Sequence, residues 1–215
     1  MADAVSLTVR GTICTFAAIM MIPAATTVLG IDSRSQNLSG HELVAALRRG
    51  GFVIVMRHAS SPRLPPDKQI AAGDNVNLER QLDAAGRGSA IAMGDALSRL
   101  KIPIGRVLTS SAYRARETAR LAKLPNPVSI DELGDNGQSM QGVPPAQTAW
   151  LQKTVTQFPT GSVTFLLTHM PNIAAAFPAL ATGVADGEGL VFGPDGKGGA
   201  TLVARIKIED WPQMK

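Results

Sequence analysis

Short apolar runs alternate along this chain with longer segments in which apolar residues recur every three or four positions. Runs that are apolar on both faces are typical of strands inside a parallel sheet, and the longer spacing is typical of helices packed against it. We predict strands over residues 52–56, 106–110, 127–131 and 162–168. We predict helices over residues 41–50, 84–100, 112–124 and 146–158.

Because predicted strands and helices alternate, the sheet should be mostly parallel, with helices on both faces. Two further strand-like runs, at residues 189–193 and 200–208, are joined by the turn sequence "PDGKGG", which predicts a hairpin. The predicted fold class is α/β, a three-layer α/β/α sandwich whose mostly parallel sheet carries a C-terminal antiparallel hairpin at its edge.

Residues that cap or end helices stand at the expected boundaries. Asn37 and Ser39 can cap the first helix, which Gly50 ends, and Asp83 can cap the second. Pro125 is expected to stop the third helix because its ring cannot continue a helical backbone.

The N-terminal segment differs from the rest because residues 11–30 carry no charge and become rich in small residues toward their end. A weakly positive start at Arg10, an apolar middle and small residues near a cleavage point form the pattern of a secretory signal. We expect residues 1–30 to be a signal peptide, or an uncleaved N-terminal anchor, and residues 31–215 to form one domain. The protein is then exported, with the periplasm as its expected compartment, and touches a membrane only through this segment if it is uncleaved.

Composition and charge exclude several classes of function. Cys14, the single cysteine, lies in the N-terminal segment, so a mature form has no thiol for disulfides, nucleophilic attack or zinc binding. The formal net charge is +4, but the basic residues are spread along the chain and are not interleaved with aromatic side chains, so no nucleic-acid partner is expected. A few local cations favour a smaller anionic ligand, and a solvated basic surface explains most of the remaining charge.

Polar residues follow three of the predicted strands at the point where each strand ends. Arg57 and His58 follow the first strand, Ser110 and Arg114 the second, and His169 the third. Ligands of open α/β sheets bind beyond the carboxyl ends of the strands, so we expect these side chains to converge on one crevice. Guanidinium groups bind phosphoryl oxygens through paired hydrogen bonds, and an imidazole near neutral pH is both a nucleophile and an acid–base group.

Two histidines at strand ends could instead be metal ligands. The third imidazole, His41, stands at a predicted helix start far from the strand ends, and no HxH or HExxH spacing occurs. We therefore expect neither a metal nor another cofactor.

The segments around these residues resemble the signatures of the histidine phosphatase superfamily, which has the phosphoglycerate-mutase-like fold. "MRHASS" resembles its Arg-His-Gly motif, and "TSSAYRARETA" resembles its second signature, a Ser followed by Arg-Ala-x-x-Thr-Ala. "LLTHMPN" is similar to the strand that delivers the second histidine, and "RQLDAAGRGSA" to the segment Leu-Thr-x-x-Gly. The resemblance spans residues 52–172 in the family's order, and the chain is similar in its compactness to the phosphatase branch.

This resemblance implies a role for each residue at the strand ends. His58 is the nucleophile and is transiently phosphorylated, Arg57 and Arg114 hold the phosphoryl oxygens, and His169 completes the pocket as a hydrogen-bond donor. Ser61 matches a hydroxyl residue three positions after the nucleophile and is expected to make a secondary substrate contact. We expect the two neighbouring cations to lower the pKa of His58 and so favour its neutral, attacking form.

The sequence departs from the family pattern at two points. Ala59 replaces the usual Gly after the first histidine, which is tolerated unless the backbone there needs a positive φ. The family usually supplies a proton to the leaving group from a Glu or Asp at a variable position. Here "SIDELGDNG" offers Asp131, Glu132 and Asp135, of which we favour Glu132, while ordinary loop carboxylates remain the alternative.

The predicted function is metal-independent hydrolysis of a phosphomonoester through a phosphohistidine intermediate on His58. The expected partner is a small phosphorylated substrate or a phosphoprotein. Two alternatives remain: a phosphohistidine-protein phosphatase, whose imidazole leaving group needs no acid, and a non-catalytic module that binds phosphate or a phosphorylated glycan.

Overall fold

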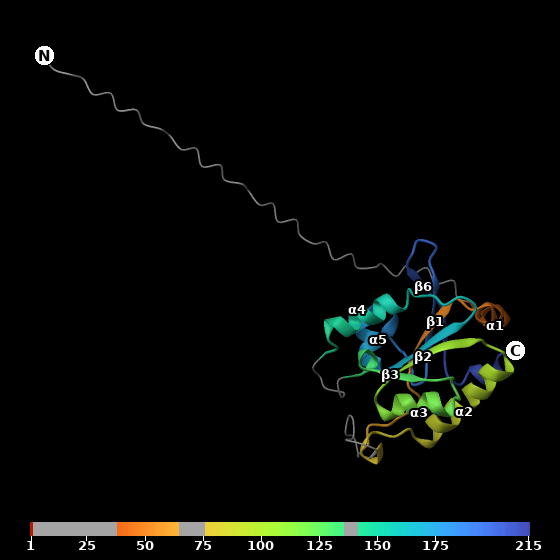
Figure 1. Ribbon diagram of the computed structural model, residues 1–215. Coiled ribbons are helices and arrows are strands. Elements are labelled where there is room, and N and C mark those ends of the chain that lie inside the picture. Colours follow the sequence, from red (N-terminus) through yellow and green to blue (C-terminus); the bar gives the residue numbers. More distant parts are fainter. Residues whose placement is uncertain (2–37, 65–75, 136–141) are drawn as a thin grey trace.

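The computed structural model describes residue 1 and residues 38–64, 76–135 and 142–215 (Figure 1). The predicted signal segment, most of the loop after the first strand and much of the glycine-rich loop at 134–142 lie outside these residues. A six-stranded sheet has the order β3-β2-β4-β1-β5-β6. Its strands are β1 (Phe52–Arg57), β2 (Ile104–Ser110), β3 (Val128–Ile130), β4 (Val163–Thr168), β5 (Gly189–Pro194) and β6 (Ala200–Ile206).

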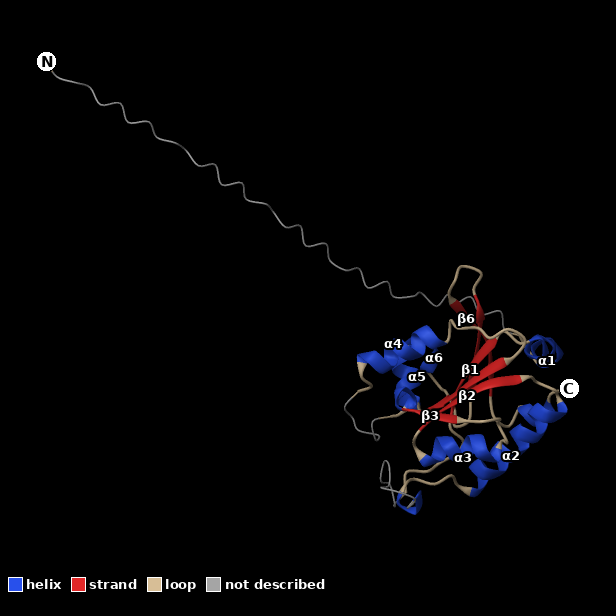
Figure 2. Cartoon of the chain, in the orientation of Figure 1, coloured by secondary structure: helices blue, strands red, loops and turns tan. Residues whose placement is uncertain are grey.

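Helices cover both faces of this sheet (Figures 1 and 2). One face packs against α1 (Gly40–Arg49), α2 (Ala84–Arg99) and α3 (Tyr113–Leu121), and the other against α4 (Pro145–Thr154), α5 (Met170–Ala176) and α6 (Pro178–Ala181). Because successive strand side chains point to opposite faces, Ile54 and Met56 of β1 join the first core, whereas Val53 and Val55 join the second. β5 and β6 are antiparallel at the edge, so the predicted three-layer fold is confirmed.

The two histidines reach the same edge of the sheet because β1 and β4 are parallel neighbours in matched register. Arg57 pairs with Thr168, so His58 and His169 are the next residues on adjacent strands. The N–H of His58 donates to the carbonyl of Thr168 at 3.1 Å. β2 pairs with the other side of β4 and brings Ser110 to this edge. The predicted convergence of three strand ends is confirmed.

Two helices are shorter than predicted. α3 ends at Leu121, before the expected stop, because Lys123 adopts a φ of 52° and the N–H of Leu124 returns to the carbonyl of Ala119 at 3.0 Å. α4 ends at Thr154, where a run of β-branched residues begins, rather than at the predicted residue 158. Three short 3-10 turns complete the described elements: η1 (Val76–Leu78), η2 (Asp131–Leu133) and η4 (Trp211–Gln213). No helix of the described residues is long and apolar enough to cross a membrane.

The start of α2 packs tightly against the turn that follows β1. Asp83 caps the helix as predicted, since its carboxylate accepts the N–H of Gly86 at 2.6 Å, whereas Ser39 at the start of α1 makes no side-chain cap. Gly86 is buried against the backbone of Ser60, and a Cβ on Gly86 would lie 2.2 Å from the carbonyl oxygen of Ser60. The glycine thus permits a close approach of two backbones next to the histidines.

A Gly86→Ala substitution should therefore destabilise the protein by roughly 1–3 kcal/mol, because backbone cannot move aside as a side chain can. Gly88→Ala, two residues along the same helix, meets nothing within 4 Å and is expected to stabilise by up to about 1 kcal/mol. Urea unfolding of both variants measures the difference. Equal midpoints for the two variants would contradict the close approach.

Candidate active site

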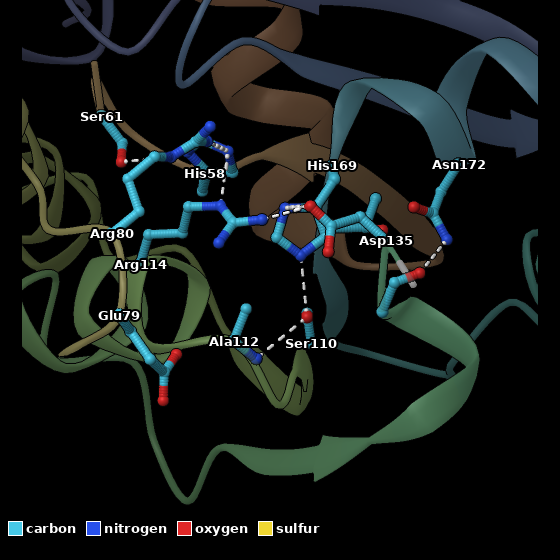
Figure 3. A network of polar contacts seen from close by, with 12 residues as sticks. His58, Ser61, Glu79, Arg80, Ser110, Ala112, Arg114, Asp135, His169 and Asn172 are labelled. Atoms are coloured by element: carbon cyan, nitrogen blue, oxygen red, sulfur yellow. Dashed lines mark hydrogen bonds and ion pairs between the residues drawn. The ribbon is translucent and has the colours of Figure 1, made fainter. Parts of the chain in front are cut away.

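His58 is buried at the end of β1, and its hydrogen bonds fix which ring nitrogen can attack. The residue is 2% exposed, and Nδ1 lies 2.8 Å from the carbonyl oxygen of Ala59. Because a carbonyl only accepts, Nδ1 carries the ring proton. Nε2 presents its lone pair and accepts from Nη2 of Arg80 at 3.2 Å and from Nε of Arg114 at 3.3 Å (Figure 3). A neutral nucleophilic nitrogen is thus held beside two guanidiniums.

The backbone accommodates Ala59 where the family motif has glycine. Ala59 is not among the described non-glycine residues that adopt a positive φ. Its N–H donates to Oγ1 of Thr118 at 3.1 Å, and that hydroxyl donates to the carbonyl of Arg114 at 2.7 Å. These two bonds tie the turn after the nucleophile to the helix that carries Arg114.

Arg80 is a site residue that the sequence analysis missed. It is 5% exposed, and its Nε donates to Oγ of Ser61 at 3.0 Å. Ser61 in turn donates to the carbonyl of Gln81 at 2.7 Å. Ser61, which was predicted to contact the substrate, therefore supports Arg80 in the structure. In the sequence Arg80 stands in an ordinary charged pair with Glu79, which is equally typical of an exposed loop.

Glu79 connects the Arg80 segment to α3. It is 1% exposed, and Oε2 accepts the N–H of Tyr113, the first residue of α3, at 2.6 Å. Because Arg80 and Arg114 lie directly beside these two residues in the chain, the contact keeps both guanidiniums at the same imidazole.

His169 lies against His58, with their ring centroids 5.2 Å apart. Its Nε2 is 2.8 Å from Oγ of Ser110, a hydroxyl that also accepts the N–H of Ala112 at 3.1 Å. Its Nδ1 lies 3.6 Å from Oδ2 of Asp135. A separation of 3.6 Å is too long for a hydrogen bond, so Nδ1 is buried without a hydrogen-bond partner among the described residues.

Arg57 contacts a different loop from the other two guanidiniums. Its Nη1 donates to the carbonyl of Val184 at 3.0 Å, and its Nη2 lies 2.6 Å from the carboxylate of Asp186. Its Nε is buried and has no hydrogen-bond partner within the part of the chain that the structure describes.

Of the three candidate acids, the structure brings Asp135 to the histidines. Its carboxylate pairs with Nη2 of Arg114 and reaches Nδ1 of His169 (Figure 3). Glu132 lies in η2, is half-buried and makes no hydrogen bond or ion pair with any described residue. The main chain of Asp131 faces α4, where its carbonyl accepts Nε2 of Gln147 at 2.9 Å.

The pocket therefore combines two imidazoles with two buried guanidiniums. The guanidiniums of Arg80 and Arg114 surround the lone pair of His58, and the carboxylate of Asp135 pairs with Arg114. In the described parts of the chain, no group of three His, Cys, Asp or Glu residues is placed to hold a metal ion. The arrangement suits a compact anion with several oxygens.

A scan against protein-family models finds no match, and a search of curated proteins finds none either. Among solved structures, the chain is similar to the protein histidine phosphatase SixA complexed with tungstate, with 19% identity and a TM-score of 0.55 over 74% of this chain and 98% of that one. The chain has the fold of a histidine phosphatase. A mutant phosphoserine phosphatase from Entamoeba histolytica in complex with phosphoserine also matches, with 11% identity and a TM-score of 0.49 over 74% and 98%. The histidine phosphatase fold predicted from the motifs is confirmed.

In this histidine phosphatase fold, both imidazoles are kept neutral. Burial is the largest cause of a pKa of His58 well below 6.5, and His169, Arg114 and Arg80 lower it further. Burial is also the largest cause of the lowered pKa of His169, and Arg114, Arg80 and Arg57 lower it further. The predicted direction for His58 is confirmed, but burial rather than the neighbouring cations is the main cause, and Arg57 acts on the other histidine.

These lowered pKa values make the protein less stable in acid. An unfolded histidine binds a proton near pH 6.5, whereas each buried ring binds one only at lower pH, so the unfolded state gains protons first. Stability should therefore be full above about pH 6.5 and should fall as the pH drops below that value toward the folded-state pKa values. Urea midpoints between pH 7.5 and 5 measure this slope. The slope should become shallower in His58→Gln, and an unchanged slope in that variant would contradict the assignment.

Proposed function

We propose that this protein hydrolyses phosphorylated substrates through a phosphohistidine intermediate on His58, without a metal ion. The observation that carries the proposal is the lone pair of Nε2, fixed by the Nδ1–H bond to Ala59 and faced by the guanidiniums of Arg80 and Arg114. A pocket that only binds phosphate does not need an oriented nucleophile. The tungstate in the similar SixA structure, itself an oxyanion, supports the same kind of ligand.

The proposed reaction has two displacements at phosphorus. In the first, Nε2 of His58 forms a bond to phosphorus as the bond to the leaving oxygen or nitrogen breaks. In the second, water attacks the phosphoryl group, the N–P bond breaks, and inorganic phosphate leaves the neutral imidazole. The N–H groups that Arg80 and Arg114 direct at Nε2 move to the phosphoryl oxygens, so the charge is already in place when the transition state forms.

Two predicted ligands complete this scheme. Nε of Arg57 is buried without a hydrogen-bond partner among the described residues, and it is proposed to donate to a phosphoryl oxygen while Asp186 holds the rest of the guanidinium. Nδ1 of His169 is proposed to donate to a second oxygen. A phosphoryl dianion would favour the charged form of His169 and strengthen that hydrogen bond.

Turnover of p-nitrophenyl phosphate by the purified chain, in the presence of EDTA, tests the activity. The proposal expects turnover that EDTA leaves unchanged and that vanadate or tungstate inhibits. The competing function is a non-catalytic module for phosphate or a phosphorylated glycan. Tight phosphate binding without turnover of this activated ester would favour the module.

We propose Asp135, rather than Glu132, as the acid for substrates with an alkoxide leaving group: the phosphoryl oxygens take over the Arg114 guanidinium, and the carboxyl of Asp135, in its protonated form, gives its proton to the leaving oxygen. Asp135→Asn should lower turnover of alkyl phosphates by about 10²-fold or more, because a poor leaving group needs a proton in the transition state. Turnover of p-nitrophenyl phosphate should fall far less, since that leaving group is stable as an anion. Glu132→Gln is the matched control in the same segment and is expected to change neither rate beyond twofold. A selective loss in Glu132→Gln would restore the original assignment.

The role of Asp135 also distinguishes the two candidate classes of substrate. A phosphohistidine-protein phosphatase is the second candidate, because imidazole leaves without an acid and the similar SixA structure carries the name protein histidine phosphatase. Rates on phosphohistidine peptides and on alkyl phosphates, measured with wild type and Asp135→Asn, separate the two. Loss of the alkyl activity alone identifies Asp135 as the acid for phosphomonoesters.

We further propose that the protein is exported and acts in the periplasm, on the strength of the uncharged segment at residues 11–30. N-terminal sequencing of the protein recovered from a periplasmic extract tests this. A retained Met1 in a cytosolic fraction contradicts export, and a membrane fraction with an intact N-terminus identifies the anchor instead.

A further inference from the structure

Two side chains hold the segment that carries Asp135. Oγ1 of Thr168, the last residue of β4, donates to the carbonyl of Leu133 at 2.8 Å. Nδ2 of Asn172, in the first turn of α5, donates to the carbonyl of Gly134 at 2.8 Å (Figure 3). The two carbonyls belong to the residues directly before Asp135, so its backbone is fixed from one side.

These side chains are buried more deeply than a surface turn requires. Thr168 is 0% exposed and Asn172 is 2% exposed. Oδ1 of Asn172 has no hydrogen-bond partner among the described residues. A buried oxygen without a partner lowers stability, whereas an apolar side chain of similar size would not. The contact of the amide that the structure shows is its bond to Gly134.

We propose that Thr168 and Asn172 form a clamp that positions Asp135 for proton transfer. This inference rests on the proposed function, in which Asp135 is the acid. His169 lies between the two clamp residues in the chain, so one turn fixes both the imidazole and the carboxylate, whose Nδ1 and Oδ2 atoms lie 3.6 Å apart. A displacement of about 1 Å in such a group lowers the rate strongly, because proton transfer depends on orientation.

Thr168→Val tests the clamp, because valine keeps the shape of threonine and removes the hydroxyl. Turnover of alkyl phosphates should fall by about tenfold or more, with little change in KM or in turnover of p-nitrophenyl phosphate. Thr168→Ser keeps the hydroxyl and should recover most of the rate. Thr154→Val is the matched control, since Thr154 is also buried and donates to the carbonyl of Trp150 at 2.8 Å in α4; it should leave both rates unchanged.

A double-mutant cycle separates positioning from a merely structural role. If Thr168 acts through Asp135, Thr168→Val should add no further loss in an Asp135→Asn background, and Asn172→Ala should behave in the same way. Additive losses overturn the clamp. A selective loss in Asp135→Asn with no loss in either clamp variant overturns the clamp alone and leaves the acid in place. No selective loss in Asp135→Asn overturns the acid, and the clamp with it.

Discussion

His58→Ala should abolish turnover, with a loss on the order of 10⁴-fold or more in kcat, because the substitution removes the only atom that forms the bond to phosphorus. The ring is held by Ala59 on one side and by Arg80 and Arg114 on the other. In a rapid-quench experiment, the wild-type chain should take up a label from a phosphorylated substrate, and this label should be acid-labile and base-stable. The variant should take up none.

His41→Ala provides the control for that experiment. His41 is exposed at the start of α1 and should retain full turnover and full labelling. Folding of His58→Ala is checked by its urea transition, since removing a buried neutral ring leaves a cavity but no unpaired charge. Labelling of His58→Ala at the wild-type level would contradict the assignment of the nucleophile.

Arg114→Lys should lower kcat/KM by about 10²–10³-fold although the charge is conserved. The guanidinium uses Nε for His58 and Nη2 for Asp135, and a single ammonium cannot occupy both positions. Arg114→Met should in addition lower the free energy of unfolding by about 3–5 kcal/mol, because it breaks the buried ion pair of Arg114 with Asp135. Steady-state kinetics and urea unfolding measure the two effects separately.

Arg116→Lys is the matched control on the same helix. Arg116 lies 3.7 Å from Glu79 with 43% of its side chain exposed, so the same substitution should change activity by less than twofold and stability by less than about 0.5 kcal/mol. Similar losses for Arg114→Lys and Arg116→Lys would show that the buried guanidinium of Arg114 has no special role.

The layers of the fold and the meeting of His58 with His169 follow from local patterns in the sequence. Each imidazole directly follows an apolar strand, and parallel strands end at one edge, so no long-range information is needed to bring them together. Arg114 was found for the same reason, because it lies one turn beyond the end of β2 on α3. The direction of the pKa shift of His58 was predicted from the neighbouring cations, whereas burial is its main cause.

Arg80 could not be found in this way. It is 22 residues from His58 in the chain, and no local pattern in the sequence places its guanidinium at that imidazole. Glu132 and Asp135 are only three residues apart, and the sequence does not show which of them faces the histidines, since the contacts of this segment come from Thr168 and Asn172, more than 30 residues later. The contact of Arg57 with Asp186 likewise depends on a loop 129 residues later in the sequence.

The matched register of β1 and β4 has a consequence for redesign. Adding or deleting one residue in either strand would shift one ring by about 3.3 Å and rotate it onto the opposite side of the pleat, so the reactive pair tolerates no change of strand length. The connections that leave the carboxyl edge tolerate changes of length only where they still deliver Arg80 and Asp135 to the two rings.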